Sequence, residues 1–195
     1  MLIHTCCADC LLKFFQTLTK EEQEKSQIYF YNPNIYPREE YNSRLRAVKK
    51  VVKGLNTKIK IIVPNYLPQK YFHSLKKANF TNKPRENKYL TDVFTIVPKS
   101  KRCSRCWELR LRALFEQAKV EGISLVSSTL FSSNYQDLST IKQIANKLSQ
   151  EFQIDFYYPK LTLADRNKVN RGFYKQNYCG CLYSLVEKSR EKYEI

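Results

Sequence analysis

Glycine, histidine and long apolar runs are scarce in this chain of 195 residues. No apolar run approaches the length of about 18 residues that a membrane-spanning helix needs, and residues 1–10 lack the long apolar core of a signal peptide. We therefore expect a cytoplasmic protein without a membrane partner. The four glycines are few enough that each should mark a helix end, a turn or a close backbone approach. They are Gly54, Gly122, Gly172 and Gly180.

Acidic residues are also scarce, because 34 Lys and Arg stand against 18 Asp and Glu and leave a formal net charge of +16. Lys and Arg attract phosphate groups, so a polyanionic partner such as nucleic acid is expected. The basic residues are spread along the whole chain, and we expect no single stripe of them. A basic proteome or an adaptation for solubility is the alternative explanation of the charge.

Segments with the pattern of strands alternate with segments of helical periodicity along the chain. This order is typical of an α/β fold with a parallel sheet and right-handed crossovers. We predict one metalloenzyme domain over residues 1–195, since no internal repeat or domain boundary interrupts the order. A polar, proline-punctuated stretch over residues 79–101 is predicted to be a long loop or lid. The predicted strands are 2–5, 28–31, 58–63, 124–130 and 154–158, and the predicted helices are 10–19, 38–53, 69–78, 102–119 and 136–152, with a last helix ending the tail 163–195.

Seven cysteines occur in three tight groups near the start, the middle and the end of the chain. The first group directly follows the first predicted strand, and open parallel sheets bind ligands at the carboxyl ends of their strands. It also lies near a helix N-terminus, where the dipole lowers a thiol pKa. The second group lies on the first turn of the helix predicted over 102–119. If the fold brings the groups together, a metal or redox centre results. The expected metal ligands are Cys6, Cys7, Cys10, Cys103, Cys106, Cys179 and Cys181.

The cysteine spacing alone leaves the chemistry of this centre open. A secreted disulfide framework is disfavoured, because the count is odd and adjacent Cys6 and Cys7 suit two separate bridges poorly. The pair Cys103 and Cys106 suits structural zinc, an iron–sulfur cluster or a redox dithiol. Zinc takes four ligands and leaves three cysteines as buried core residues, whereas a cluster leaves thiolates for a second metal. We expect the cluster, and structural zinc is the alternative.

Three residues near the cysteines have two explanations each. Asp9 could ligate a harder second metal, since carboxylate and thiolate together suit iron or zinc, or it could cap the helix that follows. His4 lies in the first predicted strand and is expected to be a buried residue rather than a ligand. Trp107 is expected in the core rather than as a stacking platform for a base.

Four segments of the chain together resemble the cobalamin-independent epoxyqueuosine reductases, formerly a family of unknown function. The segments run in the family's order and cover nearly the whole chain. They are His4-Thr5-Cys6-Cys7-Ala8-Asp9-Cys10; Tyr31-Asn32-Pro33-Asn34-Ile35-Tyr36-Pro37 with Glu40, Tyr41 and Arg44; Arg102-Cys103-Ser104-Arg105-Cys106 with Arg110; and Tyr174-Lys175-Gln176-Asn177-Tyr178-Cys179-Gly180-Cys181 with Ser184.

This resemblance implies a HUP-like (Rossmann-like) α/β fold, with a parallel sheet, flanking helices and a cysteine-rich metal site at the strand carboxyl ends. It implies a [4Fe-4S] cluster with an adjacent mononuclear metal, iron or zinc. The implied reaction is the last step of queuosine formation. Two electrons from an external donor remove the epoxide oxygen of epoxyqueuosine at the wobble position of the tRNA anticodon. The implied partner is therefore tRNA rather than DNA.

Two positions depart from the family's pattern. Asp9 stands where the family usually has proline, although Cys10 keeps the position of a ligand. The lead-in to Arg102 is longer than usual, so the lid is expected to differ. We predict Asp9 and Cys10 as catalytic residues beside the second metal.

Eight residues are predicted to bind the substrate. Polar and aromatic side chains after the second strand and before the last cysteine group could hydrogen-bond to an extruded base or stack on it. Two arginines beside the second group could contact phosphates. The structural alternatives are a turn built from Asn and Pro and the solvated face of a helix. The eight are Asn32, Asn34, Tyr36, Tyr174, Gln176, Tyr178, Arg102 and Arg110.

Two other functions compete with this one. An ATP-dependent tRNA thiolase, another tRNA-modifying enzyme of HUP-like fold, would need a glycine-bearing phosphate loop after the first strand. This chain has Cys6-Cys7-Ala8-Asp9-Cys10 there, without glycine. A zinc-stabilised tRNA-binding module would be colourless and would bind tRNA without reducing it.

Overall fold

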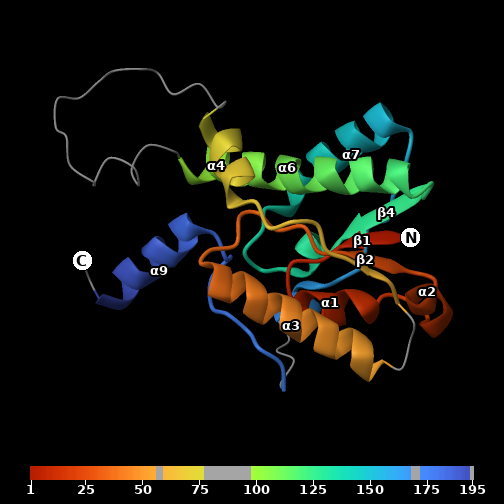
Figure 1. Ribbon diagram of the computed structural model, residues 1–195, viewed down its shortest axis with the longest axis horizontal. Helices are drawn as coiled ribbons and strands as arrows, with labels where there is room; N and C mark the ends of the chain where they lie inside the picture. Colours follow the sequence, from red (N-terminus) through yellow and green to blue (C-terminus); the bar gives the residue numbers. More distant parts are fainter. Residues whose placement is uncertain (56–58, 77–97, 168–171, 194–195) are drawn as a thin grey trace.

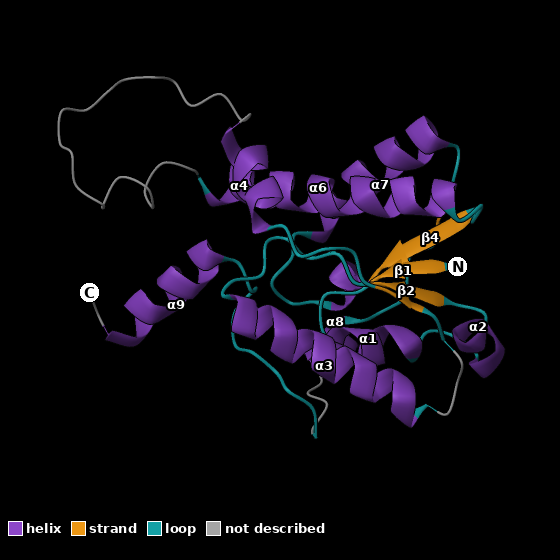
Figure 2. Ribbon diagram, in the orientation of Figure 1, coloured by secondary structure: helices purple, strands orange, loops and turns teal. Residues whose placement is uncertain are grey.

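A five-stranded parallel sheet forms the centre of the computed structural model, which describes residues 1–55, 59–76, 98–167 and 172–193. The strand order is β3-β2-β1-β4-β5, and Leu2 of the central strand pairs with Gln27 on one side and Val126 on the other. The predicted α/β fold with a parallel sheet is confirmed (Figure 2). The strands are β1 (Leu2–His4), β2 (Gln27–Tyr29), β3 (Ile61–Ile62), β4 (Leu125–Ser128) and β5 (Asp155–Phe156).

Helices cover both faces of the sheet (Figure 1). The predicted helices are all present, with ends that differ by a few residues. Helices α2, α8 and η1 were not predicted, and η1 begins within the strand predicted over 124–130. The helices are α1 (Ala8–Phe15), α2 (Lys20–Glu24), α3 (Arg38–Gly54), α4 (Pro68–Lys76), α6 (Lys99–Val120), the 3-10 helix η1 (Thr129–Ser132), α7 (Leu138–Phe152), α8 (Leu163–Asn167) and α9 (Leu182–Tyr193). No helix within these described residues is long and apolar enough to cross a membrane.

Alternation along the strands divides the apolar side chains between two cores, because successive residues of a strand face opposite sides of a sheet. Leu2 and Val126 pack with residues of α6 and α7, such as Phe115. Ile3 and Ile28 pack on the other face with residues of α1 and α3. Full burial of an apolar side chain of this size contributes about 1.5–3 kcal/mol. The two cores therefore hold both helical layers against the sheet, and with them the cysteines that these helices carry.

Two helix starts differ from the prediction. Helix α1 begins at Ala8 with Cys7 at its N-cap, so Asp9 lies inside the first turn and its alternative interpretation as the helix cap is wrong. Helix α6 begins at Lys99 with Pro98 at its N-cap. Lys, Ser and Arg can continue a helix and nothing after Pro98 interrupts it, so the second cysteine group lies one turn later than predicted.

The loop or lid predicted over residues 79–101 falls only partly within the described residues. Residues 79–97 lie outside them. The last part of the predicted loop, from Lys99 onward, belongs to α6.

The sheet has a topological switch point between β1 and β4. From β1 the chain builds outward to β2 and β3 and then returns to the other side of β1 to form β4 and β5. In open parallel sheets, ligands bind outside the carboxyl ends of the strands at such a point. The segment after β1 begins the first cysteine group, and the segment after β4 is η1. The backbone N–H of Cys6 donates to Thr129 Oγ1 across this gap at 3.1 Å.

Candidate metal centre

Three sulfurs of the first group lie close together in the crevice at the switch point. The Sγ atoms of Cys6, Cys7 and Cys10 all lie within 4.8 Å of one another, and this is the one such group of potential ligands among the described residues. Cys7 is the N-cap of α1 and Cys10 follows within the first turn, so the helix turns the third sulfur back towards the other two. The Cys6 and Cys7 sulfurs are 3.9 Å apart, close to the edge of about 3.8 Å that tetrahedral metal–sulfur bonds of about 2.3 Å produce.

One of the other four cysteines lies beside this triad, and the remaining three lie near that one. Cys103 and Cys106 come from α6, and Cys179 and Cys181 from the segment that leads into α9. Cys179 lines the same pocket as the triad, and Cys181 belongs to a buried cluster with Cys106. The fold thus places cysteines of the first and last groups in one pocket, and cysteines of the second and last groups in an adjoining cluster and cavity.

Backbone contacts hold the last group in place. Ile35, which follows β2, forms an antiparallel bridge with Cys181, and the Tyr36 N–H donates to the carbonyl of Gly180 at 2.8 Å. These contacts tie the C-terminal cysteines to the carboxyl end of the sheet. The Ser184 N–H lies 3.4 Å from Cys181 Sγ as α9 begins.

Two buried arginines, Arg44 of α3 and Arg110 of α6, line the sulfur pocket. Arg44 donates from Nε to Glu40 Oε1 at 2.5 Å and from Nη1 to the carbonyl of Cys179 at 3.1 Å. Arg110 donates from Nε to the carbonyl of Cys106 at 3.3 Å, but its buried Nη2 has no hydrogen-bond partner in the described part of the chain. Arg110 also has no carboxylate ion pair within the described residues.

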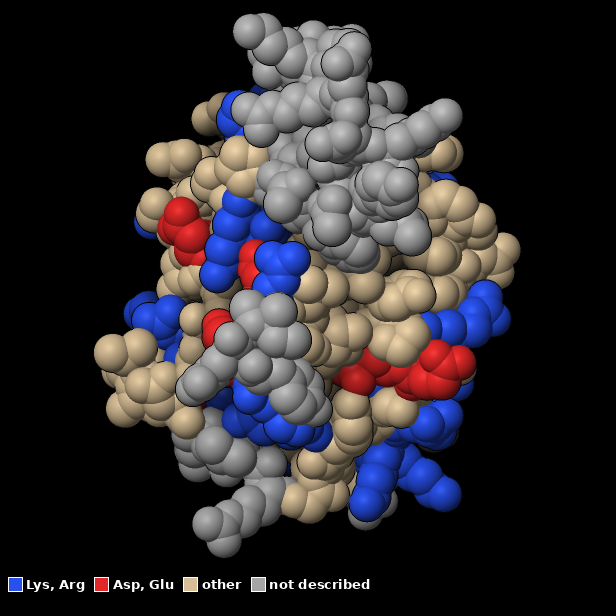
Figure 3. Space-filling view, turned by 90° about the vertical axis from the view of Figure 1, so that its left-hand side faces the viewer, with Lys and Arg blue, Asp and Glu red and all other residues tan. Residues whose placement is uncertain are grey.

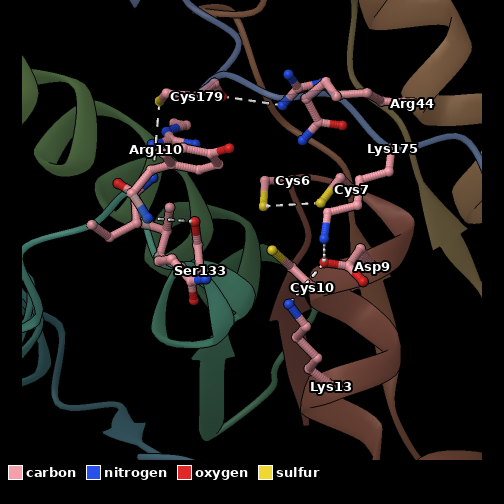
Figure 4. A pocket seen from close by; sticks show the side chains of 15 residues that line it. Cys6, Cys7, Asp9, Cys10, Lys13, Arg44, Arg110, Ser133, Lys175 and Cys179 are labelled. Carbon is pink, nitrogen blue, oxygen red and sulfur yellow. Dashed lines mark hydrogen bonds and ion pairs between the residues drawn. The ribbon is translucent and has the colours of Figure 1, made fainter. Parts of the chain in front are cut away.

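A buried guanidinium whose charge has no carboxylate to pair with is costly, by several kcal/mol. The pocket therefore suits a group that brings negative charge, and thiolates bound to a metal would do so. The donor set and the orphaned Nη2 of Arg110 both fit an anionic metal–sulfur centre. In Figure 4, the sulfurs of Cys6 and Cys7 lie between Arg110 on one side and Asp9 with Lys175 on the other.

The thiols differ in their tendency to ionise. Hydrogen bonds with Cys10 and Cys6 hold the pKa of Cys7 well below its usual value. A hydrogen bond with Cys181 likewise lowers the pKa of Cys179. Burial raises the pKa of Cys106 to about 12, against the opposing effect of the Arg110 charge. One sulfur in the first group and one in the last are thus the favoured thiolates of the protein before any metal binds.

His4 of β1 is buried, as predicted, and both of its ring nitrogens have partners within the protein. It is fully buried, and burial lowers its pKa to about 3. Its Nε2 lies 3.2 Å from the carbonyl of Tyr31, and a carbonyl can only accept, so Nε2 carries the proton. Nδ1 then accepts from the Ser128 hydroxyl at 2.9 Å.

Asp9 is paired with two lysines at the edge of the pocket. Its Oδ2 lies 2.8 Å from Lys13 Nζ and 3.5 Å from Lys175 Nζ. Lys13 is 3% exposed and also donates to the carbonyl of Arg166 at 2.7 Å. Asp9 is therefore the centre of a largely buried ionic cluster that joins α1 to the segment before the last cysteines.

The eight predicted substrate-binding residues lie in different places. Gln176 and Arg110 line the sulfur pocket, and the Gln176 Oε1 is buried without a partner among the described residues. Arg102 and Tyr178 line a second cavity of about 300 Å³ that also contains Cys103, Cys179 and Cys181. Cys179 lines both cavities.

The remaining predicted substrate residues do not line the sulfur pocket. Asn32 is buried and donates from Nδ2 to the carbonyl of Thr5 at 2.8 Å. Asn34 is buried, and neither atom of its side-chain amide has a partner within the described ranges. Tyr36 is 41% exposed, and the Tyr174 hydroxyl donates to Glu40 Oε2.

Two residues near the cysteines, Arg44 and Tyr71, were not predicted to have a role. Arg44 was noted only within a motif, although its spacing of four residues from Glu40 on a helix is a signal for an ion pair. Tyr71 of α4 is 1% exposed, and burial together with the nearby thiols raises its pKa. No pattern in the sequence of α4 indicates that contact. Trp107 is buried in the core, as predicted, and donates to Gln136 Oε1 at 2.5 Å.

Fold and site together define a Rossmann-like α/β protein with a cysteine-rich candidate metal centre at the switch point of its sheet. A family model described as Epoxyqueuosine reductase QueH matches residues 1–187. The chain belongs to this family. The resemblance drawn from the four sequence segments is thereby confirmed, as is the prediction of an oxidoreductase.

Curated relatives named Epoxyqueuosine reductase QueH are similar over most of their length. The relative from Thermotoga maritima is 28% identical over an alignment of 205 residues, which covers 100% of this chain and 95% of that protein. The relative from Dehalococcoides mccartyi is 30% identical over 192 residues, which cover 96% and 93%. The relative from Staphylococcus epidermidis is 27% identical over 204 residues, which cover 96% and 77%.

Proposed function

We propose that this chain reduces epoxyqueuosine at the wobble position of tRNA to queuosine. One epoxide, two electrons and two protons give one alkene and one water, and an external donor supplies the electrons. The observation that carries the proposal is the convergence of the cysteine groups and two buried arginines at the switch point, in a member of this family. We treat residues 1–195 as one metalloenzyme domain.

The proposal includes a [4Fe-4S] cluster with an adjacent iron or zinc ion, held by the seven cysteines. When bound, these groups would supply electrons singly and a Lewis acid for the leaving oxygen. Cys6, Cys7 and Cys10 form the tighter set of donors, and the other four cysteines complete the ligands. The lowered pKa of Cys7 and of Cys179 supports metal binding, because the thiolate is the ligand form.

Proton delivery falls to charged residues beside the sulfurs. Asp9 and Cys10, neighbours in the first turn of α1, are the proposed catalytic residues. Lys175 lines the pocket, and its Nζ lies 3.5 Å from Asp9 Oδ2. A proton on Lys175 Nζ can pass to an oxygen leaving the substrate in this pocket, and Asp9 holds the ammonium in place for that transfer.

Substrate contacts form the remaining part of the proposal. Gln176 Oε1 and Arg110 Nη2 are buried polar atoms without partners among the described residues, in or beside the sulfur pocket. A hydroxyl or ring nitrogen of the modified base would satisfy them. The full proposed set remains the eight predicted residues: Asn32, Asn34, Tyr36, Tyr174, Gln176, Tyr178, Arg102 and Arg110.

An assay on tRNA carrying epoxyqueuosine tests the function. Anaerobically reconstituted protein and a low-potential chemical reductant should convert the modified nucleoside to one lighter by a single oxygen atom, as measured by mass spectrometry of digested tRNA. Cys7→Ser and Cys179→Ser should abolish this turnover. Lys119→Gln, an exposed change on α6, is the matched control and should retain it. Full activity in either cysteine variant would defeat the shared centre.

A zinc-stabilised tRNA-binding module is the second candidate function. The 3.9 Å separation of the Cys6 and Cys7 sulfurs favours it, because that spacing suits one tetrahedral ion. Protein of this kind would bind tRNA with zinc alone and would leave epoxyqueuosine unchanged in the same assay.

A further inference from the structure

Four exposed basic residues form a stripe along one face of α3. Arg46, Lys49, Lys50 and Lys53 have the spacing i, i+3, i+4 and i+7, which places them on one side of a helix over about 10 Å. Helical geometry thus gathers on one face charges that look dispersed in the sequence. On the face that Figure 3 draws, Lys and Arg occur in several separate groups, with Asp and Glu between some of them.

The stripe differs from an ordinary solvated helix face, where opposite charges alternate at i and i+4. Helix α3 has no acidic residue after Glu40, and Glu40 is itself buried against Arg44. Within the described residues, none of the four stripe cations forms an ion pair. The C-terminal helix dipole favours only the last of them, so like charges face each other along the stripe.

A groove runs beside the stripe. It has a volume of about 250 Å³, and Arg46 and Lys50 line one wall while Phe173 and Tyr174 line the other. The Arg46 Nη2 donates to Ser43 Oγ at 3.0 Å, and Lys50 Nζ lies 5.7 Å from the centre of the Phe173 ring. Two cations beside an aromatic ring are the combination that binds phosphates and stacked bases of a nucleic-acid strand.

The groove and the sulfur pocket are lined by consecutive residues of the chain. Residues Phe173 and Tyr174 form its wall, and the next two residues, Lys175 and Gln176, line the sulfur pocket. Three residues of extended chain span at most about 11 Å. A polyanion in the groove would therefore lie directly beside whatever occupies the pocket.

We propose that the α3 stripe and this groove bind the sugar–phosphate backbone of the substrate tRNA next to the nucleotide that enters the sulfur pocket. The inference rests on the proposed function, and it adds the direction from which tRNA approaches the pocket. The α3 side of the sheet faces the tRNA, and the outer faces of α6 and α7 on the opposite side do not (Figure 1).

Two triple variants with the same loss of charge test this surface. The stripe variant is Arg46→Gln/Lys49→Gln/Lys50→Gln on α3. The control variant is Lys119→Gln/Lys142→Gln/Lys147→Gln on α6 and α7. All six side chains are exposed, so circular dichroism and thermal unfolding should match wild type in both variants.

Binding of unmodified substrate tRNA is then measured by fluorescence anisotropy at several salt concentrations. The stripe variant should bind at least tenfold more weakly at about 0.15 M salt, and its slope of log K against log salt should fall by about 2 to 3. The control variant should keep the wild-type slope and affinity. In turnover assays the stripe variant should raise KM for tRNA and leave kcat unchanged.

Equal losses in the two variants would show that net charge alone attracts tRNA, and wild-type binding by the stripe variant would exclude this surface. Either result overturns the inference. The proposed function still stands in both cases if the wild-type protein reduces epoxyqueuosine in tRNA. If the stripe variant alone loses binding but wild type reduces nothing, the surface is supported and the reductase proposal fails. If wild type binds no tRNA, both fail.

Discussion

Replacing Gly180 with alanine should disrupt the site more than any other glycine substitution in the described chain. Gly180 lies between the last two cysteines with a φ of 110°, a region that L-residues enter at a cost of about 1–2 kcal/mol. A Cβ there would lie 2.7 Å from both Nη1 and Nη2 of Arg44. The guanidinium would have to move away from the backbone that it supports.

Displacement of Arg44 removes two of its contacts. Its bonds to the carbonyls of Cys179 and Tyr178, at 3.1 and 3.4 Å, would be lost, at about 1–1.5 kcal/mol each. With the backbone strain, we expect Gly180→Ala to lower the free energy of unfolding by about 3–5 kcal/mol. The change should also reduce the iron bound per chain, because the same backbone positions Cys179 and Cys181.

Substitutions at two other glycines distinguish the effect of backbone strain from the effect of steric conflict. Gly122 has a φ of 65°, but a Cβ added there would meet no described atom within 4 Å, so Gly122→Ala should show strain alone. Gly54 has neither feature, so Gly54→Ala should be neutral or stabilising by up to about 1 kcal/mol. Urea unfolding of the three variants, loaded in the same way, measures the difference. The reasoning is refuted if Gly180→Ala unfolds at the same urea concentration as Gly122→Ala.

Two further predictions concern buried charge. Asp9→Asn should lower the free energy of unfolding by about 3–5 kcal/mol, because the ammonium of Lys13 stays buried without its carboxylate. The double variant Asp9→Asn/Lys13→Met should regain most of this stability in urea unfolding. A double variant as unstable as Asp9→Asn would contradict the pairing. His4 should make the protein acid-sensitive, because the unfolded ring takes up a proton near pH 6.5 while the folded pKa is about 3. The free energy of unfolding should fall as pH drops below about 6.5, by about 1.4 kcal/mol at pH 5.5. Chemical denaturation above pH 6.5 and at pH 5.5 measures this loss, and His4→Gln should not show it.

The sheet and the place of the first cysteines could be predicted because both depend on local sequence. Cys6 and Cys7 follow a strand, and the carboxyl end of a parallel strand is where such folds bind ligands. The burial of His4 followed from the same strand. These predictions needed only the order of elements, which hydrophobic periodicity reveals.

The rest of the site depends on packing between distant elements. Nothing in the sequence shows that Arg110 is buried without a carboxylate in the described chain, or that Asp9 meets Lys175 from a segment more than a hundred residues away. Arg44 reaches Cys179 only because Gly180 leaves space for its guanidinium. The start of α6 was misplaced for a local reason, since polar residues after Pro98 resemble loop in composition yet continue the helix.

The iron and acid-labile sulfide content of anaerobically purified protein tests the metal–sulfur centre most directly. Brown protein with about four or five iron and about four sulfide per chain is predicted, because a cluster and one adjacent metal then occupy the seven thiols. Colourless protein with about one zinc, unchanged by anaerobic reconstitution with iron and sulfide, would contradict the reductase and leave the zinc-stabilised tRNA-binding module.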